Sequence, residues 1–181
     1  MQESGTRPVA QPLDLGRELL EAFEHSCRVS EYVVDVLPSR VWRPEPPDSK
    51  GRSIAAIVAH IQSVRRTFVK MGGARPIPPG LDRARSRPDD ARRGLRQSRE
   101  ALMTLFREAL KQDQPRVKGM PRRTVNMMIY LIQHDAHHRG QICALARALG
   151  HPLSKDDVMR IWGWKSLTPS CWWAVGVAPL L

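Results

Sequence analysis

The 181-residue sequence contains only three cysteines, and their placement excludes a small domain stapled by disulfides. Cys27, Cys143 and Cys171 are odd in number and widely spaced, and no CxxC pair occurs. Disulfide frameworks need dense, paired cysteines and an oxidising compartment. Isolated thiols are typical of a reducing cytoplasm, so we predict a cytoplasmic protein.

Long hydrophobic runs are also missing. No stretch approaches the roughly 20 apolar residues that a membrane-spanning helix needs. The longest apolar stretch, CWWAVGVAPLL at 171–181, is too short and lies at the wrong end of the chain for a secretory signal. Residues 1–12 are polar and contain proline, so we expect a loose leader there. The sequence therefore predicts a single domain over residues 1–181 with its own core and no membrane partner.

Strand-like alternation is weak throughout, which leaves helices as the main secondary structure. Apolar residues recur at helical spacing in four long segments, which cover approximately residues 13–37, 53–71, 89–111 and 121–149. Ser53 is a good N-cap, and Gly150 suits a left-handed position after the fourth helix. A short helix in SKDDVMRIWGWKSL, capped by Ser154, follows. The pattern predicts an all-α four-helix bundle with a short C-terminal helix.

The same periodicity predicts which residues face the core. Leu15 is placed on the apolar face of the first helix and Met71 on that of the second, whereas His25 falls off the apolar face.

Acidic residues are outnumbered, 18 against 29 basic ones, which gives a net charge of +11. Many arginines lie in LDRARSRPDDARRGLRQSRE, from Arg83 to Arg99. Such a run suits an anion-binding surface for nucleic acid or an acidic substrate, or else a solvated helix face that follows a loop. No aromatic residues interleave it, as a single-strand binder would need. We therefore favour the solvated face and predict no specific binding of nucleic acid.

Three of the six histidines lie in one short stretch, LIQHDAHHRGQ at 131–141. Three explanations are open: the histidines form a metal site, one of them is a general base with accessory groups, or they fill the core. His134 and His138 are one helical turn apart, so their imidazoles converge beside the helix. His137 lies on the flank of this face, and Asp135 is predicted to point to the surface. The predicted inward face consists of Met127, Leu131, His134, His138, Gln141 and Leu145.

A third ligand would favour a metal site, because two histidines alone hold a metal poorly. His60, on the edge of the apolar face of the second helix, is the candidate, although a lone histidine there also suits a structural role. Three neutral imidazoles leave coordination positions for water or substrate, which is the pattern of catalytic sites. His25 and His151 are poor candidates by position.

Two segments resemble the DinB/YfiT superfamily of bacterial proteins: GRSIAAIVAHIQSVRRTFVKMGG at 51–73 and QHDAHHRGQICALARALGHPL at 133–153. The similarity extends from VVDVLPSRVWRPEPP to IWGWKSL. It implies an up-down-down-up bundle, a homodimer, and a divalent metal such as zinc or nickel, with iron as a further candidate. The family's three metal-binding histidines fall on His60, His134 and His138.

The resemblance also implies a class of chemistry, because characterised relatives include bacillithiol transferases and mycothiol-dependent isomerases. We accordingly expect a metal-dependent enzyme that activates a low-molecular-weight thiol for transfer to a small electrophile. The alternatives are a hydrolase that uses metal-activated water and a metal-binding stress protein without enzymatic activity. The sequence identifies no catalytic residue beyond the metal ligands.

Overall fold

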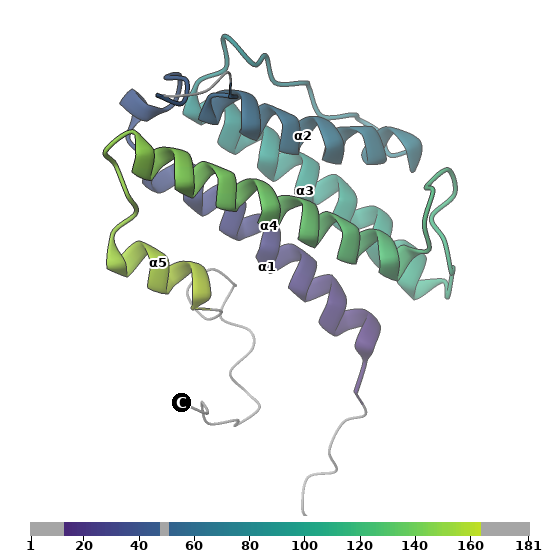
Figure 1. Ribbon diagram of the computed structural model, residues 1–181. Coiled ribbons are helices and arrows are strands. Elements are labelled where there is room, and N and C mark those ends of the chain that lie inside the picture. The colour runs from purple at the N-terminus through teal and green to yellow at the C-terminus, as the bar shows by residue number, and fades with distance from the viewer. Residues whose placement is uncertain (1–12, 48–50, 164–181) are drawn as a thin grey trace, which may run out of the picture.

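The computed structural model describes residues 13–47 and 51–163, so the expected leader at 1–12 and the apolar stretch at 171–181 lie outside the described residues. Helices account for the regular structure of this part of the chain (Figure 1), and no strand occurs in it. The elements are α1 (Leu15–Val36), the 3-10 turn η1 (Ser39–Val41), α2 (Ile54–Met71), α3 (Pro88–Lys111), α4 (Thr124–Ala148) and α5 (Lys155–Trp162). The predicted all-α fold with a short C-terminal helix is confirmed.

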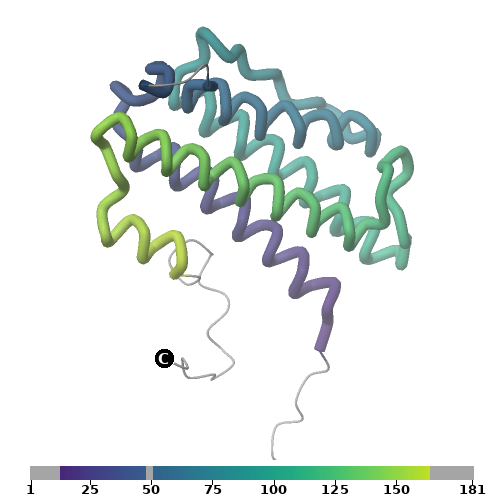
Figure 2. Tube along the Cα trace, in the orientation of Figure 1, coloured from purple at the N-terminus to yellow at the C-terminus, as the bar shows by residue number. Residues whose placement is uncertain are grey.

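The four long helices form a bundle in which α1 and α2 occupy opposite corners. Each of them packs against both α3 and α4. The connector at 72–87 returns along α2, so that α2 and α3 run in the same direction, opposite to α1 and α4 (Figure 2). This is the up-down-down-up connectivity that the resemblance implied. None of the helices in the described residues combines the length and apolar character that crossing a membrane requires.

Local signals fix the helix ends. The Ser53 hydroxyl accepts a hydrogen bond from the backbone N–H of Ala56 at 3.3 Å, and Ser154 caps α5 through the N–H of Asp157 at 3.0 Å. Gly150, with φ of 80°, adopts the left-handed conformation after α4. These caps satisfy backbone groups that a helix leaves without partners, and all three were predicted.

The core consists of two apolar clusters with a polar layer between them. One cluster surrounds Trp42 and Ile54 near η1, and the other surrounds Phe23 and Phe106, whose rings meet edge to face at 5.3 Å. Between the clusters lie fully buried polar side chains, which include Gln62, Arg65, Ser98 and Asp135. The candidate site lies beside this layer.

The predicted core faces of the first two helices are wrong at three positions. Leu15 is 70% exposed, because the first turn of α1 lies at the end of the bundle, and Met71, in the last turn of α2, is exposed as well. His25 is buried, at 6% exposure, and lines a cavity together with residues of α4 and α5. The periodicity had placed this histidine off the apolar face of the first helix.

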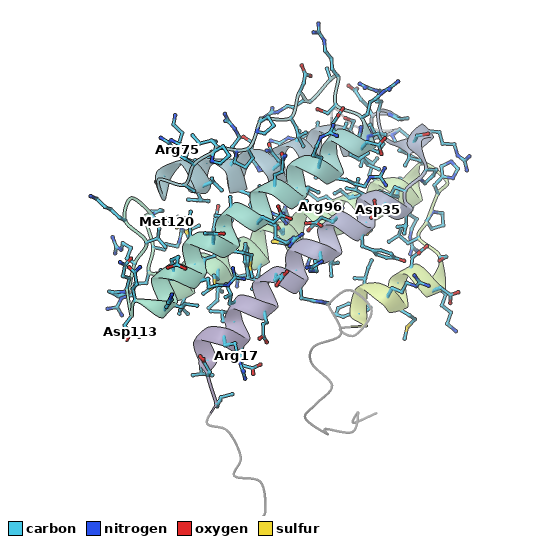
Figure 3. The ribbon with its side chains drawn as sticks, turned by 180° about the vertical axis from the view of Figure 1, so that it is seen from behind. Arg17, Asp35, Arg75, Arg96, Asp113 and Met120 are labelled. Carbon is cyan, nitrogen blue, oxygen red and sulfur yellow. The ribbon has the colours of Figure 1, made fainter. Side chains whose placement is uncertain are left out.

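Several arginines of the Arg83–Arg99 run form ion pairs with α1. Arg99 is buried and donates to Glu31 at 2.8 Å and to Glu24 at 3.3 Å. Arg92 pairs with Asp35 at 2.7 Å, and Asp35 is labelled in the view from behind (Figure 3). Part of the positive charge in this run is thus neutralised within the bundle.

Candidate metal centre

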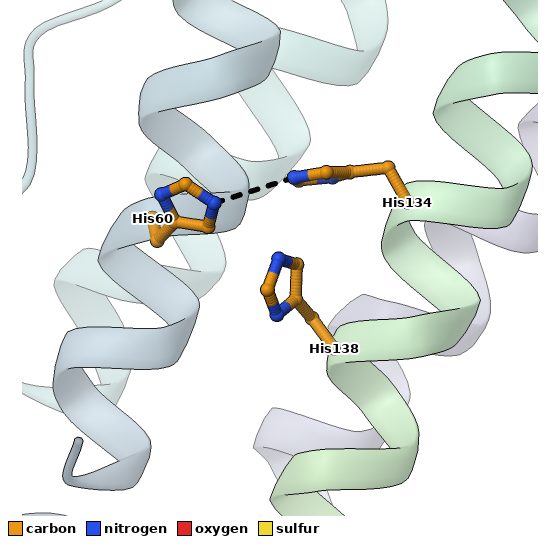
Figure 4. A group of neighbouring side chains, drawn as sticks. All are labelled: His60, His134 and His138. Carbon is orange, nitrogen blue, oxygen red and sulfur yellow. Dashed lines mark hydrogen bonds between the residues drawn. The ribbon is translucent and has the colours of Figure 1, made fainter. Parts of the chain in front are cut away.

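Three histidines from two neighbouring helices meet at one point. His60 projects from α2, and His134 and His138 project from α4 (Figure 4). The Nε2 atoms of His60 and His134 are 3.4 Å apart, and one ring nitrogen from each of the three residues lies within 4.8 Å of the others. The structure thus brings together the three residues that sequence analysis selected.

The spacing suits a single divalent ion. Zinc–imidazole bonds of about 2.0–2.1 Å in a tetrahedral arrangement place neighbouring ligand nitrogens about 3.4 Å apart. The His60–His134 distance already has this value. Small side-chain rotations would bring His138 to the same separation. Three histidines so placed fit a metal ion without any rearrangement of the helices.

Hydrogen bonds orient two of the rings. The Nδ1 of His138 lies 2.7 Å from the side-chain oxygen of Gln141, and the Nδ1 of His134 lies 3.3 Å from Asp135 Oδ1. Both oxygens are acceptors, so each Nδ1 carries the proton and each Nε2 keeps its lone pair. Histidine ligands in metal sites are commonly held by such bonds.

The surroundings favour neutral imidazoles. Burial lowers the pKa of His60, and the nearby His138, His134, Arg52 and Arg83 add to this effect. Burial also lowers the pKa of His138, against the bond to Gln141, which favours the protonated ring. Since only neutral imidazole binds a metal, both shifts prepare the site for an ion at neutral pH.

Asp135 does not point to the surface, as predicted, but is 1% exposed and pairs with Arg65. Arg65 is fully buried; its Nε and Nη2 both bond to Asp135 Oδ2, and its Nη1 donates to Leu95 O at 3.3 Å. Burial alone would raise the pKa of the Asp135 carboxyl, but the guanidinium of Arg65 and the bond from His134 hold it below its ordinary value. The carboxylate therefore supports His134 from the polar layer.

The predicted inward face of α4 is confirmed at Met127, Leu131, His138 and Leu145 and is wrong at Gln141. Asp135 and Ile142 are buried, Gln141 is exposed, and His134 is half-buried on the flank. The buried Arg65 of α2 explains the difference, because a carboxylate must face it in the core. Periodicity treated Asp135 as a surface residue because it could not include this partner. Arg65 and Asp135 both occupy core positions on neighbouring helices. Two opposite charges at such positions were the feature of the sequence that could have indicated a buried ion pair.

A cavity of about 840 Å³ opens beside the histidines. Its wall includes His60, His138 and Arg52, and it is otherwise lined largely by apolar residues, among them Ile57, Ala144, Leu145 and Ala148. Within the described ranges, no cysteine, aspartate or glutamate joins the three histidines as a further ligand. The arrangement leaves room for a small molecule next to the ring nitrogens.

The other histidines and the two cysteines of the described residues, Cys27 and Cys143, lie elsewhere. His137 is exposed and contacts Gln141 Nε2 at 3.1 Å, whereas His151 receives a bond from Arg40 Nε at 2.9 Å. Cys27 is fully buried, and burial raises the pKa of its thiol to about 12. These residues do not reach the point where the three imidazoles meet.

Comparison with known proteins agrees with the geometry. Neither the curated proteins nor the solved structures include a match to this chain. A family model described as the DinB family matches residues 1–166, which is most of the chain and includes His60, His134 and His138. The chain therefore belongs to the DinB family.

Proposed function

We propose that this protein binds a divalent metal ion through His60, His134 and His138 and uses it to activate a small thiol for transfer to an electrophile. The observation that carries the proposal is the set of three converging imidazoles, two of which, His60 and His138, line an open cavity. A closed structural site would have a fourth protein ligand, whereas catalytic sites keep a position for water or substrate. Imidazole ligands suit zinc, nickel and iron alike.

The chemistry that such an ion supplies is Lewis acidity, which lowers the pKa of a thiol or a water molecule in its remaining position. The protein's own residues hold the geometry. Asp135 and Gln141 fix the rings of His134 and His138, and burial lowers the pKa of His60 and of His138, which favours their neutral form.

The lining of the cavity favours a thiol over water as the nucleophile. A metal ion lowers the pKa of bound water from about 15.7 to about 7, and enzymes that use such a water commonly add a general base. No carboxylate lines this cavity among the described residues, and Asp135 is already engaged by Arg65. A thiol has an ordinary pKa of about 8.5, so a Lewis acid alone suffices to ionise it at neutral pH.

The charge around the site favours an acidic thiol. Arg52 lines the cavity, and both Arg52 and Arg83 lie close enough to His60 to lower its pKa. A guanidinium is well suited to bind a carboxylate of the thiol or of its partner molecule. The substrate class that fits is therefore a low-molecular-weight thiol with at least one carboxylate.

Cobalt substitution tests the proposal. Titration of the cobalt-loaded protein with cysteine-containing thiols should produce a near-ultraviolet charge-transfer band from sulfur, and the matching serine compounds should not. Arg52→Met should weaken the response to acidic thiols and leave the response to 2-mercaptoethanol unchanged. A spectrum that responds to hydroxide and carboxylates but to no thiol would contradict thiol activation and favour a hydrolase. Unfolding of the protein on chelation would indicate a structural metal instead.

A further inference from the structure

A second cavity lies on another face of α4 and shares no lining residue with the cavity beside the histidines. It is enclosed by α1, α4 and α5 and has a volume of about 560 Å³, within the range of small-molecule pockets, about 300–1,000 Å³. Its wall is mainly apolar, with Val29 and Val33 from α1, Ile132 from α4, and Val158 and Ile161 from α5. The Tyr32 hydroxyl donates to Asp157 at 2.6 Å and ties α5 to α1.

Arg139 is a charged residue in this wall, and its hydrogen-bond partners carry no charge. Its Nη1 donates to Ser26 O at 2.9 Å and to the hydroxyls of Ser26 and Ser30, each at 3.1 Å. All three acceptors are neutral. Within the described part of the chain, no carboxylate lies within ion-pair distance of the guanidinium, and its Nε and Nη2 donate to no group. Asp135 acts on the guanidinium electrostatically from the polar layer, but this carboxylate is already paired with Arg65.

The charges around the cavity all have one sign. Arg147 also lines it, and none of its described lining residues is an aspartate or a glutamate. A buried charge is costly unless an opposite charge or a ligand compensates it. A guanidinium with free donors in an apolar pocket is complementary to a carboxylate that carries an apolar body.

We propose that this cavity binds an amphiphilic monocarboxylate, with its carboxylate on Arg139 and its apolar part between α1, α4 and α5. The binding is non-covalent, since the half-buried Cys143 on the same wall is kept in its thiol form by its surroundings. This site is independent of the metal centre, because it uses the other face of α4.

Isothermal titration of the full chain with decanoate, and with 1-decanol as the uncharged match, tests the proposal. Decanoate should bind at least about tenfold more tightly than decanol, since a charge-assisted bond in a pocket contributes that much. Arg139→Met should abolish this preference and Arg139→Lys should retain part of it. Arg160→Met, on α5 but outside the cavity lining, should bind decanoate as the wild type does.

A second variant fills the cavity without removing the charge. A Cβ added at Gly140 would meet no heavy atom within 4 Å, and Gly140 lines the cavity in the middle of α4. Gly140→Leu should therefore fold well, since it replaces a glycine inside a helix, and should lose decanoate binding while its metal content stays unchanged.

Three outcomes would overturn the proposal. Decanoate binding that is absent, or that survives in both Gly140→Leu and Arg139→Met, would show that the cavity is not the site. A change of oligomeric state in Gly140→Leu, without decanoate binding in the wild type, would show that a second copy covers this face. If decanoate bound to the double variant Trp172→Ser, Trp173→Ser but not to the wild type, the chain's own C-terminal segment would be the occupant of the cavity.

Discussion

Replacing Asp135 by asparagine tests the polar layer that supports the site. The substitution keeps the shape of the side chain and removes the negative charge that faces Arg65. Because Arg65 is 0% exposed, its guanidinium would remain as a buried charge without a counter-charge. Removing one partner of a buried ion pair costs about 3–5 kcal/mol, which is a large part of a total stability of about 5–15 kcal/mol. For a protein of this size, the melting temperature should fall by roughly 6–20 °C.

Urea denaturation of the chelator-treated protein, followed by circular dichroism, measures the loss. The matched control is Asp35→Asn, which breaks the exposed pair with Arg92 and should cost at most about 1 kcal/mol. The double variant Arg65→Met, Asp135→Leu should be more stable than Asp135→Asn, because no unpaired charge remains. It also lacks the acceptor of His134 and should bind zinc about 10–100-fold more weakly. A cost for Asp135→Asn no greater than that for Asp35→Asn would refute this reasoning.

Three further predictions concern pH, charge and backbone. The pKa values of His60 and His138 are lowered in the fold, so the unfolded chain takes up protons first as the pH falls. The stability of the apo-protein should therefore decrease below about pH 6.5, which urea titrations at pH 7.5 and 5.5 measure. If the unfolding free energy of His60→Gln changed with pH as steeply as that of the wild type, this prediction would be contradicted. The Arg83–Arg99 run should show no sequence-selective binding to duplex DNA at about 0.2 M salt in fluorescence anisotropy, and tight selective binding there would revive a nucleic-acid surface. Gly119→Ala should destabilise the fold by more than Gly73→Ala, although φ is positive at both positions. Only at Gly119 would the added Cβ collide with a backbone oxygen, that of Met71. Equal melting temperatures of the two variants would show that this collision does not occur.

Much of the fold follows from local patterns in the sequence. Ser53, Ser154 and Gly150 mark helix ends because capping depends on neighbouring residues alone. The wrong assignments of Asp135 and His25 involve contacts between helices, whereas Leu15 and Met71 lie at helix ends. Asp135 was placed on the surface because its partner Arg65 lies 70 residues away, and His25 was placed off the core although it lines a cavity together with residues of α4 and α5.

The candidate site was predictable in a different way. The i, i+4 spacing placed His134 and His138 on one side of a helix, but nothing in that spacing selected His60. Its place on the edge of the apolar face of the second helix made His60 the candidate, and the resemblance to the DinB/YfiT superfamily supported it. The packing of α2 against α4 brings His60 to the other two histidines. Neither source indicated the orienting role of Asp135, since that depends on a buried pair. The homodimer stays a prediction that light scattering would check.

The most direct test of the account is the metal content of five purified single variants. His60→Ala, His134→Ala and His138→Ala should each lose most of the zinc or nickel found in the wild type, by elemental analysis and by titration of the apo-protein. His137→Ala and His25→Ala should retain it, because His137 is exposed and His25 lies against the cavity on the other face of α4. A wild-type protein that binds no divalent ion, or metal that is lost with His137 and kept without His134, would contradict the three-histidine centre.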